Sequence, residues 1–310
     1  TKVETTTGKD GSTSKTTTNP NGSSVTETKA ADGSTGTVKT DKSGQTTAET
    51  TLSAKALEDA KKNGEAVKAP VEVEASRNSS TAPTVSIELP KGAGETKVEI
   101  PVSNANSGTV AVLVHPDGTE EILKNSLPTE NGIQLTVNGG ATVKIIDNSK
   151  AFADTQNHWS KDDVDFVAAR ELFNGVGGNR FDVSGSMTRG MVNTVLARLA
   201  GANTEGGAKW YDKGTAWARA NGISDGTNPT APVTREQLAT MLYRFAGSPD
   251  VRGDLTFKDA ANISNYAKDA MLWAVQKGIL NGVDDNRAAP GAEAERAQVA
   301  AMLARYIRNL

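Results

Sequence analysis

An arginine leads a helical pattern at Val233-Thr234-Arg235-Glu236-Gln237-Leu238, and related segments begin at Arg189 and Arg296. Apolar residues stand three, six, seven and ten positions after each arginine, a spacing that places them on one face of an α-helix. They are Val192, Val195, Leu196 and Leu199; Leu238, Met241, Leu242 and Phe245; and Val299, Met302, Leu303 and Tyr306. Because the same apolar face is written three times, we expect an architecture built from repeats.

The same features precede each arginine-led helix. An aromatic-x-Asp triplet comes first, followed by a second helical pattern, a turn containing glycine, and a loop. The triplets are Phe152-Ala153-Asp154, Trp210-Tyr211-Asp212 and Phe257-Lys258-Asp259, and the turn glycines are Gly175, Gly226 and Gly282. The glycine lies 14, 9 and 14 residues before the arginine, so the middle loop is the shortest. The sequence therefore predicts repeats at about 151–201, 208–247 and 255–310.

A single repeat could not bury its apolar face alone. We therefore expect residues 151–310 to form one all-α domain, a bundle with approximate threefold symmetry made of three helix-loop-helix repeats. All Phe, Trp, Tyr and Met residues fall after residue 150, so the aromatic core should belong to this domain.

The first 51 residues are rich in Thr, Ser and Gly and carry an 11-residue period, with glycines at Gly11, Gly22, Gly33 and Gly44. Asp-Gly and Asn-Gly pairs favour type I′ hairpin turns, and Thr favours extended chain. Few apolar side chains are available to offset the entropy lost on ordering. Two interpretations stay open for this stalk: a string of short strands, or a disordered segment.

Residues 52–148 show alternating apolar positions typical of short strands that bury one face. Ser53 is placed to cap a helix that extends to Lys62 and stops at Asn63-Gly64. We expect a small β-rich domain, either a sandwich or a single sheet with one helix, that serves as a spacer or interaction module. No catalytic constellation stands out in it.

Composition limits the chemistry. The chain has 310 residues, no cysteine and a net charge of −3, so disulfides and thiolate chemistry are excluded and no nucleic-acid partner is indicated. No apolar run is long enough to span a membrane. No signal peptide is visible at Thr1, so we expect a mature form or a fragment of a longer protein.

An arginine in the first turn of a helix stands beside free backbone N–H groups, and both attract anions. Arg189, Arg235 and Arg296 are therefore candidate anion-binding residues. The alternative is structural, either as solvated side chains or as ion pairs with Asp154, Asp212 or Asp259. A turn glycine would let backbone N–H groups approach a ligand, or would simply end a helix.

The pattern resembles the S-layer homology domain. The residues that carry the resemblance are Phe152-Ala153-Asp154 with His158-Trp159, Asn221-Gly222-Ile223 with Gly226, and Val233-Thr234-Arg235-Glu236. The resemblance implies binding of a secondary cell-wall polysaccharide, in many cases through a ketal-linked pyruvate, in grooves between adjacent repeats. Carried over by position, it implicates as polysaccharide-binding residues Arg189, Arg235, Arg296, Asp154, Asp212, Asp259, Gly175, Gly226 and Gly282.

The chain departs from the family pattern Thr-Arg-Ala-Glu. Met191, Gln237 and Gln298 replace the glutamate, and Glu295 replaces the threonine in the third repeat. We therefore expect the second repeat to be the most regular site and the third the least. Arg235→Ala should then weaken wall binding without changing helicity or melting.

Among the tryptophans, Trp159 lies in a loop-like segment and is the better candidate for a ligand contact. Trp217 and Trp273 are expected in the core. Only two histidines exist, and Asp284-Asp285-Asn286 lacks EF-hand spacing, so we expect no metal site. No cofactor motif and no hydrolase motif is present.

These observations predict a non-enzymatic, extracellular bacterial protein that is anchored non-covalently to the cell wall. Its partner would be an acidic, pyruvylated or otherwise charged wall polysaccharide, or peptidoglycan. Two alternatives stay open: a structural protein that self-associates into a surface layer, and the wall-anchoring part of a larger extracellular hydrolase.

Overall fold

The 11-residue period of the N-terminal segment produces five antiparallel strands in the computed structural model, which describes residues 1–310. Each strand has six residues, and each turn has one glycine at a positive φ close to 90°. Type I′ turns need positive φ at two residues, so the expected turn type is wrong. Asp10, Asn21, Asp32 and Asp41 instead brace the turns by accepting backbone N–H groups.

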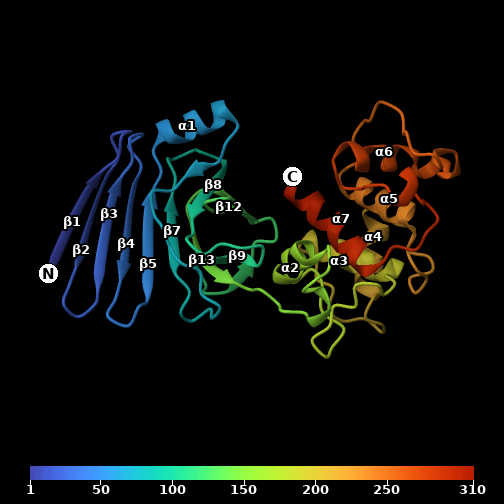
Figure 1. Ribbon diagram of the computed structural model, residues 1–310, viewed down its shortest axis with the longest axis horizontal. Helices are drawn as coiled ribbons and strands as arrows, with labels where there is room; N and C mark the ends of the chain where they lie inside the picture. The colour runs from blue at the N-terminus through green and yellow to red at the C-terminus, as the bar shows by residue number, and fades with distance from the viewer. The chain divides into compact units, whose positions relative to one another are not determined.

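The chain divides into unit 1, Thr1–Lys150, and unit 2, Ala151–Leu310. Unit 1 contains a nine-stranded sheet and a four-stranded sheet (Figure 1). In spatial order the larger sheet contains β1 (Lys2–Thr7), β2 (Thr13–Thr18), β3 (Ser24–Lys29), β4 (Thr35–Thr40), β5 (Thr46–Thr51), β7 (Thr84–Glu88), β13 (Ala141–Asp147), β9 (Thr109–Val114) and β10 (Glu120–Ile122). The smaller sheet contains β11 (Leu127–Pro128), β12 (Gly132–Asn138), β8 (Glu95–Pro101) and β6 (Val67–Lys68).

No break in the sheet separates residues 1–51 from those that follow, because β5 pairs in parallel with β7. Helix α1 (Ala54–Asn63) makes the crossover, and the predicted caps are confirmed: Ser53 Oγ accepts the Ala56 N–H at 3.0 Å, and Gly64 is left-handed. The core lies between the sheets and is formed by alternating residues such as Val85, Ile87, Ile100, Leu135 and Ile145.

Glycine 36 sets how closely the small sheet approaches the large one. A Cβ at Gly36 would lie 2.2 Å from the Pro70 carbonyl oxygen. A threonine, which is common elsewhere in this segment, could therefore not stand there without pushing residues around Pro70 away from β4.

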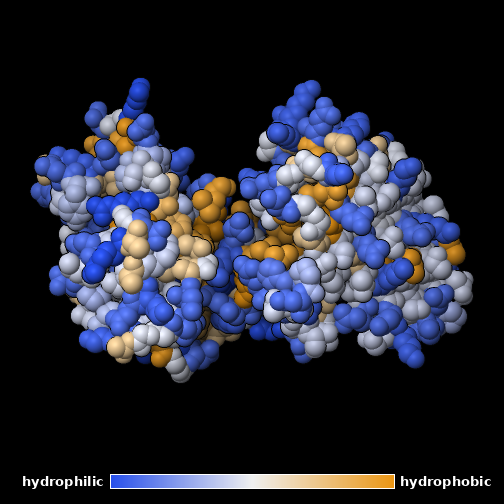
Figure 2. Space-filling model, turned by 180° about the vertical axis from the view of Figure 1, so that it is seen from behind, coloured by the Kyte–Doolittle hydropathy of each residue, from blue (hydrophilic) through white to orange (hydrophobic).

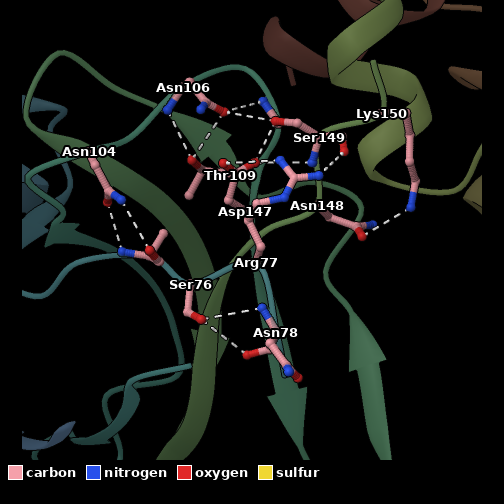
Figure 3. Close-up of polar contacts among 12 residues, drawn as sticks. Ser76, Arg77, Asn78, Asn104, Asn106, Thr109, Asp147, Asn148, Ser149 and Lys150 are labelled. Atoms are coloured by element: carbon pink, nitrogen blue, oxygen red, sulfur yellow. Dashed lines mark hydrogen bonds and ion pairs between the residues drawn. The ribbon is translucent and has the colours of Figure 1, made fainter. Parts of the chain in front are cut away.

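A polar network closes unit 1 where β13 ends (Figure 3). The Asp147 carboxylate accepts the Ser149 N–H at 3.1 Å and pairs with Arg77 at 3.8 Å. Burial raises the pKa of Asp147, but hydrogen bonds from Ser149 and the charge of Arg77 outweigh it, so the net pKa lies below its ordinary value. The Asn104 side chain holds Ala75 through both its amide oxygen and its amide nitrogen.

Unit 2 contains six α-helices joined by irregular segments and short 3-10 turns. The helices are α2 (Lys161–Ala169), α3 (Arg189–Leu199), α4 (Asp212–Ala220), α5 (Arg235–Phe245), α6 (Lys268–Gln276) and α7 (Arg296–Arg308). The 3-10 turns are η1 (Ala153–Thr155), η2 (Ala260–Asn262), η3 (Asn265–Ala267) and η4 (Asp284–Asn286). Helix α3 packs against α4, α5 against α6, and α7 against α2. Each of these pairs joins two different repeats, so the repeats pack in a closed cycle.

The predicted architecture is wrong in two respects. The chain is mixed, because the nine-stranded sheet takes the place of the expected stalk and small β-domain. Unit 2 is not an all-α bundle either, since extended segments before α3, α5 and α7 form β-bridges at Ser186–Glu295, Thr188–Pro232 and Thr234–Glu293. Buried backbone groups need partners, and these segments supply them to one another.

Three backbone hydrogen bonds form a ring at this junction. The N–H of Val233 donates to Met187 O at 2.8 Å, that of Ala294 to Val233 O at 2.9 Å, and that of Met187 to Ala294 O at 3.4 Å. All three residues are buried. The ring therefore ties the three arginine-led helices together at their starts.

Candidate functional site

Two of the three lead arginines are buried and bound to backbone. Arg235 is 5% exposed and donates to Ala288 O and Asn281 O, both at 2.9 Å. Arg296 is 8% exposed and donates to Phe181 O and Asn174 O, both at 2.8 Å. Burial lowers the pKa of both guanidinium groups. These two arginines fasten the loop of the next repeat in the cycle.

Arg189 has the same position in its helix but different partners. Its Nη2 lies 2.9 Å from Asp225 Oδ1, and its Nη1 donates to Thr227 Oγ1 at 3.3 Å. The Asp225 side chain is 66% exposed. Arg189 is therefore held by an exposed carboxylate that can rotate away, rather than by fixed carbonyl groups.

Loop length explains the difference. In the first repeat the Asp154 carboxylate accepts the N–H groups of Phe181, Asp182 and Val183, and so holds the long loop in place. Asp259 does the same for Ala288 and Ala289. Asp212 accepts only the nearby Lys209 N–H at 2.9 Å. The short middle loop is not braced by its aspartate, and the Arg189 guanidinium donates to the side chains of Asp225 and Thr227 rather than to loop carbonyl groups.

A groove of about 370 Å³ opens beside Arg189. Its lining residues come from all three repeats: Arg189, Ile223, Ser224, Asp225, Gln237, Thr240, Met241, Arg244 and Tyr266. The Arg244 Nη1 donates to Ile223 O at 3.3 Å, which leaves its other N–H groups without a protein partner. Two guanidinium groups line the groove together with one carboxylate, and guanidinium groups suit an anionic ligand.

Glu236 positions the third side of the groove. Its carboxylate is buried and accepts the Ser264 N–H at 2.9 Å and the Ser264 hydroxyl at 2.7 Å. These bonds hold the segment that carries Tyr266, a side chain 53% exposed. Burial, followed by the nearby Glu236 charge, raises the pKa of Tyr266. An exposed neutral ring beside two cations is a suitable platform for a sugar.

The helix starts are not free anion sites. The first N–H of α3, α5 and α7 donates to Ala231 O, Ala292 O and Gly185 O respectively, at 2.8 to 2.9 Å. The next N–H in each helix also donates to the neighbouring loop. The N–H groups expected to attract a ligand are thus used in the fold, and anion binding depends on side chains.

The turn glycines serve packing. A Cβ at Gly175 would lie 2.6 Å from Phe152 Cε1, and one at Gly282 would lie 2.8 Å from Phe257 Cε1. Gly226 has a positive φ of 76°, with the Arg219 guanidinium against it. None of the three is a helix cap; the left-handed glycines that follow helices in unit 2 are Gly201, Gly222, Gly247 and Gly278.

The tryptophans divide as predicted only in part. Trp159 is 60% exposed and packs on His158, whereas Trp273 is buried beside Tyr306. Trp217 is half-buried against Phe245. Trp159 does not line the groove beside Arg189; Tyr266 does.

Sequence reasoning missed Arg244 and Tyr266, although both have a signal. Arg198, Arg244 and Arg305 each stand nine residues after a lead arginine. Trp159, Trp210 and Tyr266 each stand two residues before α2, α4 or α6, and all are more than half exposed. Polar and exposed aromatic residues that recur at the same position in each repeat therefore indicate candidate groove residues, which the apolar spacing does not.

No group of three or more His, Asp or Glu side chains is arranged to hold a metal ion. Asp285, in the acidic segment before α7, pairs with Lys258. None of the helices combines the length and apolar character needed to cross a bilayer. The face drawn in Figure 2 is largely hydrophilic on both units, with apolar residues confined to patches.

Comparison with known proteins identifies the repeats. The family model of the S-layer homology domain matches residues 151–190 and 256–300. These stretches include the first and third aromatic-x-Asp triplets and the starts of α3 and α7. The match excludes the second repeat, where the loop is short.

Two curated relatives are enzymes by name. The exoglucanase XynX of Acetivibrio thermocellus is 26% identical over 58% of this chain and 18% of its own length. The amylopullulanase of Thermoanaerobacterium thermosulfurigenes is 27% identical over 50% of this chain and 9% of its own length. The chain thus corresponds to a small part of each relative.

Among solved structures, an undecaheme cytochrome from the S-layer of Carboxydothermus ferrireducens aligns with 51% of this chain and 25% of its own, at 19% identity and a TM-score of 0.29. S-layer homology domains anchor surface proteins to the cell wall, and the matches place this chain outside the cell, in the cell wall or S-layer. Residues 151–190 and 256–300 are thus similar to the S-layer homology domain.

Proposed function

We propose that the groove beside Arg189 binds an acidic group of a secondary cell-wall polysaccharide and so anchors the protein non-covalently. The observation that carries the proposal is the difference between Arg189 and its two counterparts. Arg235 and Arg296 are buried on backbone carbonyls, whereas Arg189 lines an open groove with a second arginine. Of the three lead arginines, Arg189 is the one placed to meet a ligand.

The groove can hold a carboxylate and a sugar ring together. Arg189 and Arg244 would bind the acid through charge-assisted hydrogen bonds, and Tyr266 would pack on the ring. A ketal-linked pyruvate presents one carboxylate on a compact sugar and fits this chemistry. Asp154, Asp259, Gly175 and Gly282 would act indirectly, by holding the loops and packing the repeats.

The test is sedimentation of the full chain with purified wall sacculi, before and after acid removal of the secondary polysaccharide. Arg244→Ala should weaken binding several-fold. Arg305→Ala is the matched control, because Arg305 has the same helix position and donates likewise to a backbone carbonyl, Ile279 O at 3.2 Å. Equal loss in both variants would reject the groove, and binding that survives removal of the polysaccharide would indicate peptidoglycan instead.

The relatives favour a second proposal, which concerns the larger protein to which this chain would belong. Both are named as glycan-degrading enzymes, and this chain spans less than a fifth of either. We propose that the chain is the anchoring part of a larger extracellular hydrolase. Incubation of the chain with glucans and wall glycans should then yield no reducing sugar, and turnover would show that the chain itself is catalytic.

A further inference from the structure

The Asp225 carboxylate lies where an acidic ligand would have to contact Arg189. Its Oδ1 accepts the Thr227 N–H at 2.9 Å, the Thr227 hydroxyl at 2.8 Å and Arg189 Nη2 at 2.9 Å. No hydrogen bond is made by its Oδ2. One oxygen is thus saturated with donors, while the other is in contact with solvent on a side chain that is 66% exposed.

The backbone at this position is also held by contacts that do not involve the Asp225 side chain. Arg219 Nε donates to Asp225 O at 3.1 Å, and the Gly226 N–H donates to Ser224 Oγ at 3.1 Å. The Arg219 guanidinium packs where a Cβ at Gly226 would stand. An acidic ligand could therefore replace the Asp225 carboxylate at Arg189 while the contacts of Arg219 and Ser224 keep the loop in place.

The guanidinium groups of Arg235 and Arg296 make no hydrogen bond to a carboxylate at the equivalent position. Both donate to carbonyl oxygens, which an anion cannot displace without moving the loop. Only at Arg189 is the partner an exposed carboxylate with the same chemistry as the expected ligand. Asp225 therefore occupies the guanidinium edge at which an acidic ligand would bind.

We propose that Asp225 is a built-in competitor for the acidic group, which the ligand must displace from Arg189, and that it sets the affinity and acid selectivity of the groove. This inference rests on the proposed function. Competition by an exposed carboxylate is modest, since exposed ion pairs are weak. Removing its charge should tighten binding of an acidic sugar about two- to fivefold, and should leave binding of the neutral sugar unchanged.

Calorimetry on the full chain tests the inference with two probes: a methyl N-acetylhexosaminide carrying a ketal-linked pyruvate, and the same sugar without the ketal. Asp225→Asn keeps the size of the side chain and removes its charge. Thr227→Ala is the control, because it removes a hydrogen-bond partner of both Asp225 and Arg189 but keeps the competing charge. The expected result is tighter binding of the acidic sugar by Asp225→Asn alone.

Weaker or unchanged binding by Asp225→Asn would overturn the inference and indicate that Asp225 orients Arg189 or contacts the sugar. Arg189→Ala separates this from failure of the proposed function. If Arg189→Ala no longer binds the acidic sugar, the proposed function of the groove is supported whatever the result for Asp225→Asn. If Arg189→Ala binds both sugars as the unmodified chain does, the groove itself is rejected, and the inference with it.

Discussion

The Arg296 guanidinium donates to the Phe181 carbonyl oxygen at 2.8 Å across 115 residues of sequence. It also lies over the Phe181 ring, 4.7 Å from its centroid. This contact closes the cycle of repeats, because it joins the start of the last helix to the loop of the first repeat.

Arg296→Ala should therefore destabilise unit 2. The variant leaves the buried Phe181 carbonyl and the partly buried Asn174 carbonyl without this donor, a loss of roughly 1–3 kcal/mol in the free energy of unfolding. Chemical denaturation followed by circular dichroism measures it. Arg305→Ala, at the other end of the same helix, should cost about 1 kcal/mol or less. Equal stabilities for the two variants would contradict the role given to Arg296.

Arg189→Ala should affect wall binding, whereas Arg235→Ala should affect thermal stability. Arg235→Ala should lower the melting temperature, contrary to the expectation from sequence, because the buried Ala288 carbonyl and the partly buried Asn281 carbonyl lose their donor. Arg189→Ala removes a partly exposed pair worth about 1 kcal/mol or less and should leave melting nearly unchanged while weakening wall binding. Thermal melting and sacculus sedimentation on both variants check this, and a large melting shift for Arg189→Ala would count against it.

Acid should destabilise unit 2 through Asp154 and Asp259. Burial raises the pKa of each carboxyl, but the backbone N–H groups that each accepts outweigh it, so both pKa values lie below the ordinary 3.8. A depressed pKa in the folded state stabilises the fold above the ordinary value, and that stabilisation is lost as the pH falls through the folded value.

The destabilisation caused by Asp154→Asn and Asp259→Asn should therefore reach its largest value at about pH 6. It should become smaller when the pH is well below the ordinary pKa of the carboxyl groups. Urea unfolding as a function of pH measures it. Asp212→Asn is the control, since Asp212 accepts a single local N–H group. A pH-independent difference between the variants and the unmodified chain would refute the assignment.

Gly175→Ala and Gly282→Ala should each cost about 1–3 kcal/mol, because the added Cβ would overlap the ring of Phe152 or Phe257. Gly291→Ala is the matched control, with no atom within 4 Å of the added Cβ and no positive φ. Melting temperatures of the three variants check the prediction. If Gly175→Ala melts like Gly291→Ala, the ring does not restrict that position.

Local signals in the sequence predicted much of the secondary structure. The apolar spacing after Arg189, Arg235 and Arg296 gave three helices that start at those arginines, as the structure has them. Ser53 and Gly64 marked both ends of α1. The continuous nine-stranded sheet was not predicted, because the parallel pairing of β5 with β7 is a long-range contact that no local pattern encodes.

The roles of the three arginines could not be read from their positions. Their neighbours in sequence are alike, and the second repeat is the most regular in its motif. The structure singles out Arg189 because the shorter middle loop, unbraced by Asp212, leaves its guanidinium to an exposed carboxylate.

Residue types at short, fixed spacing were enough to predict the helices that start at the lead arginines and the similarity to the S-layer homology domain. The tertiary structure alone decided which arginine is buried, which lines a groove, and that Arg244 and Tyr266 join it. Those properties depend on contacts between different repeats, and burial and solvent access arise only when the chain closes on itself.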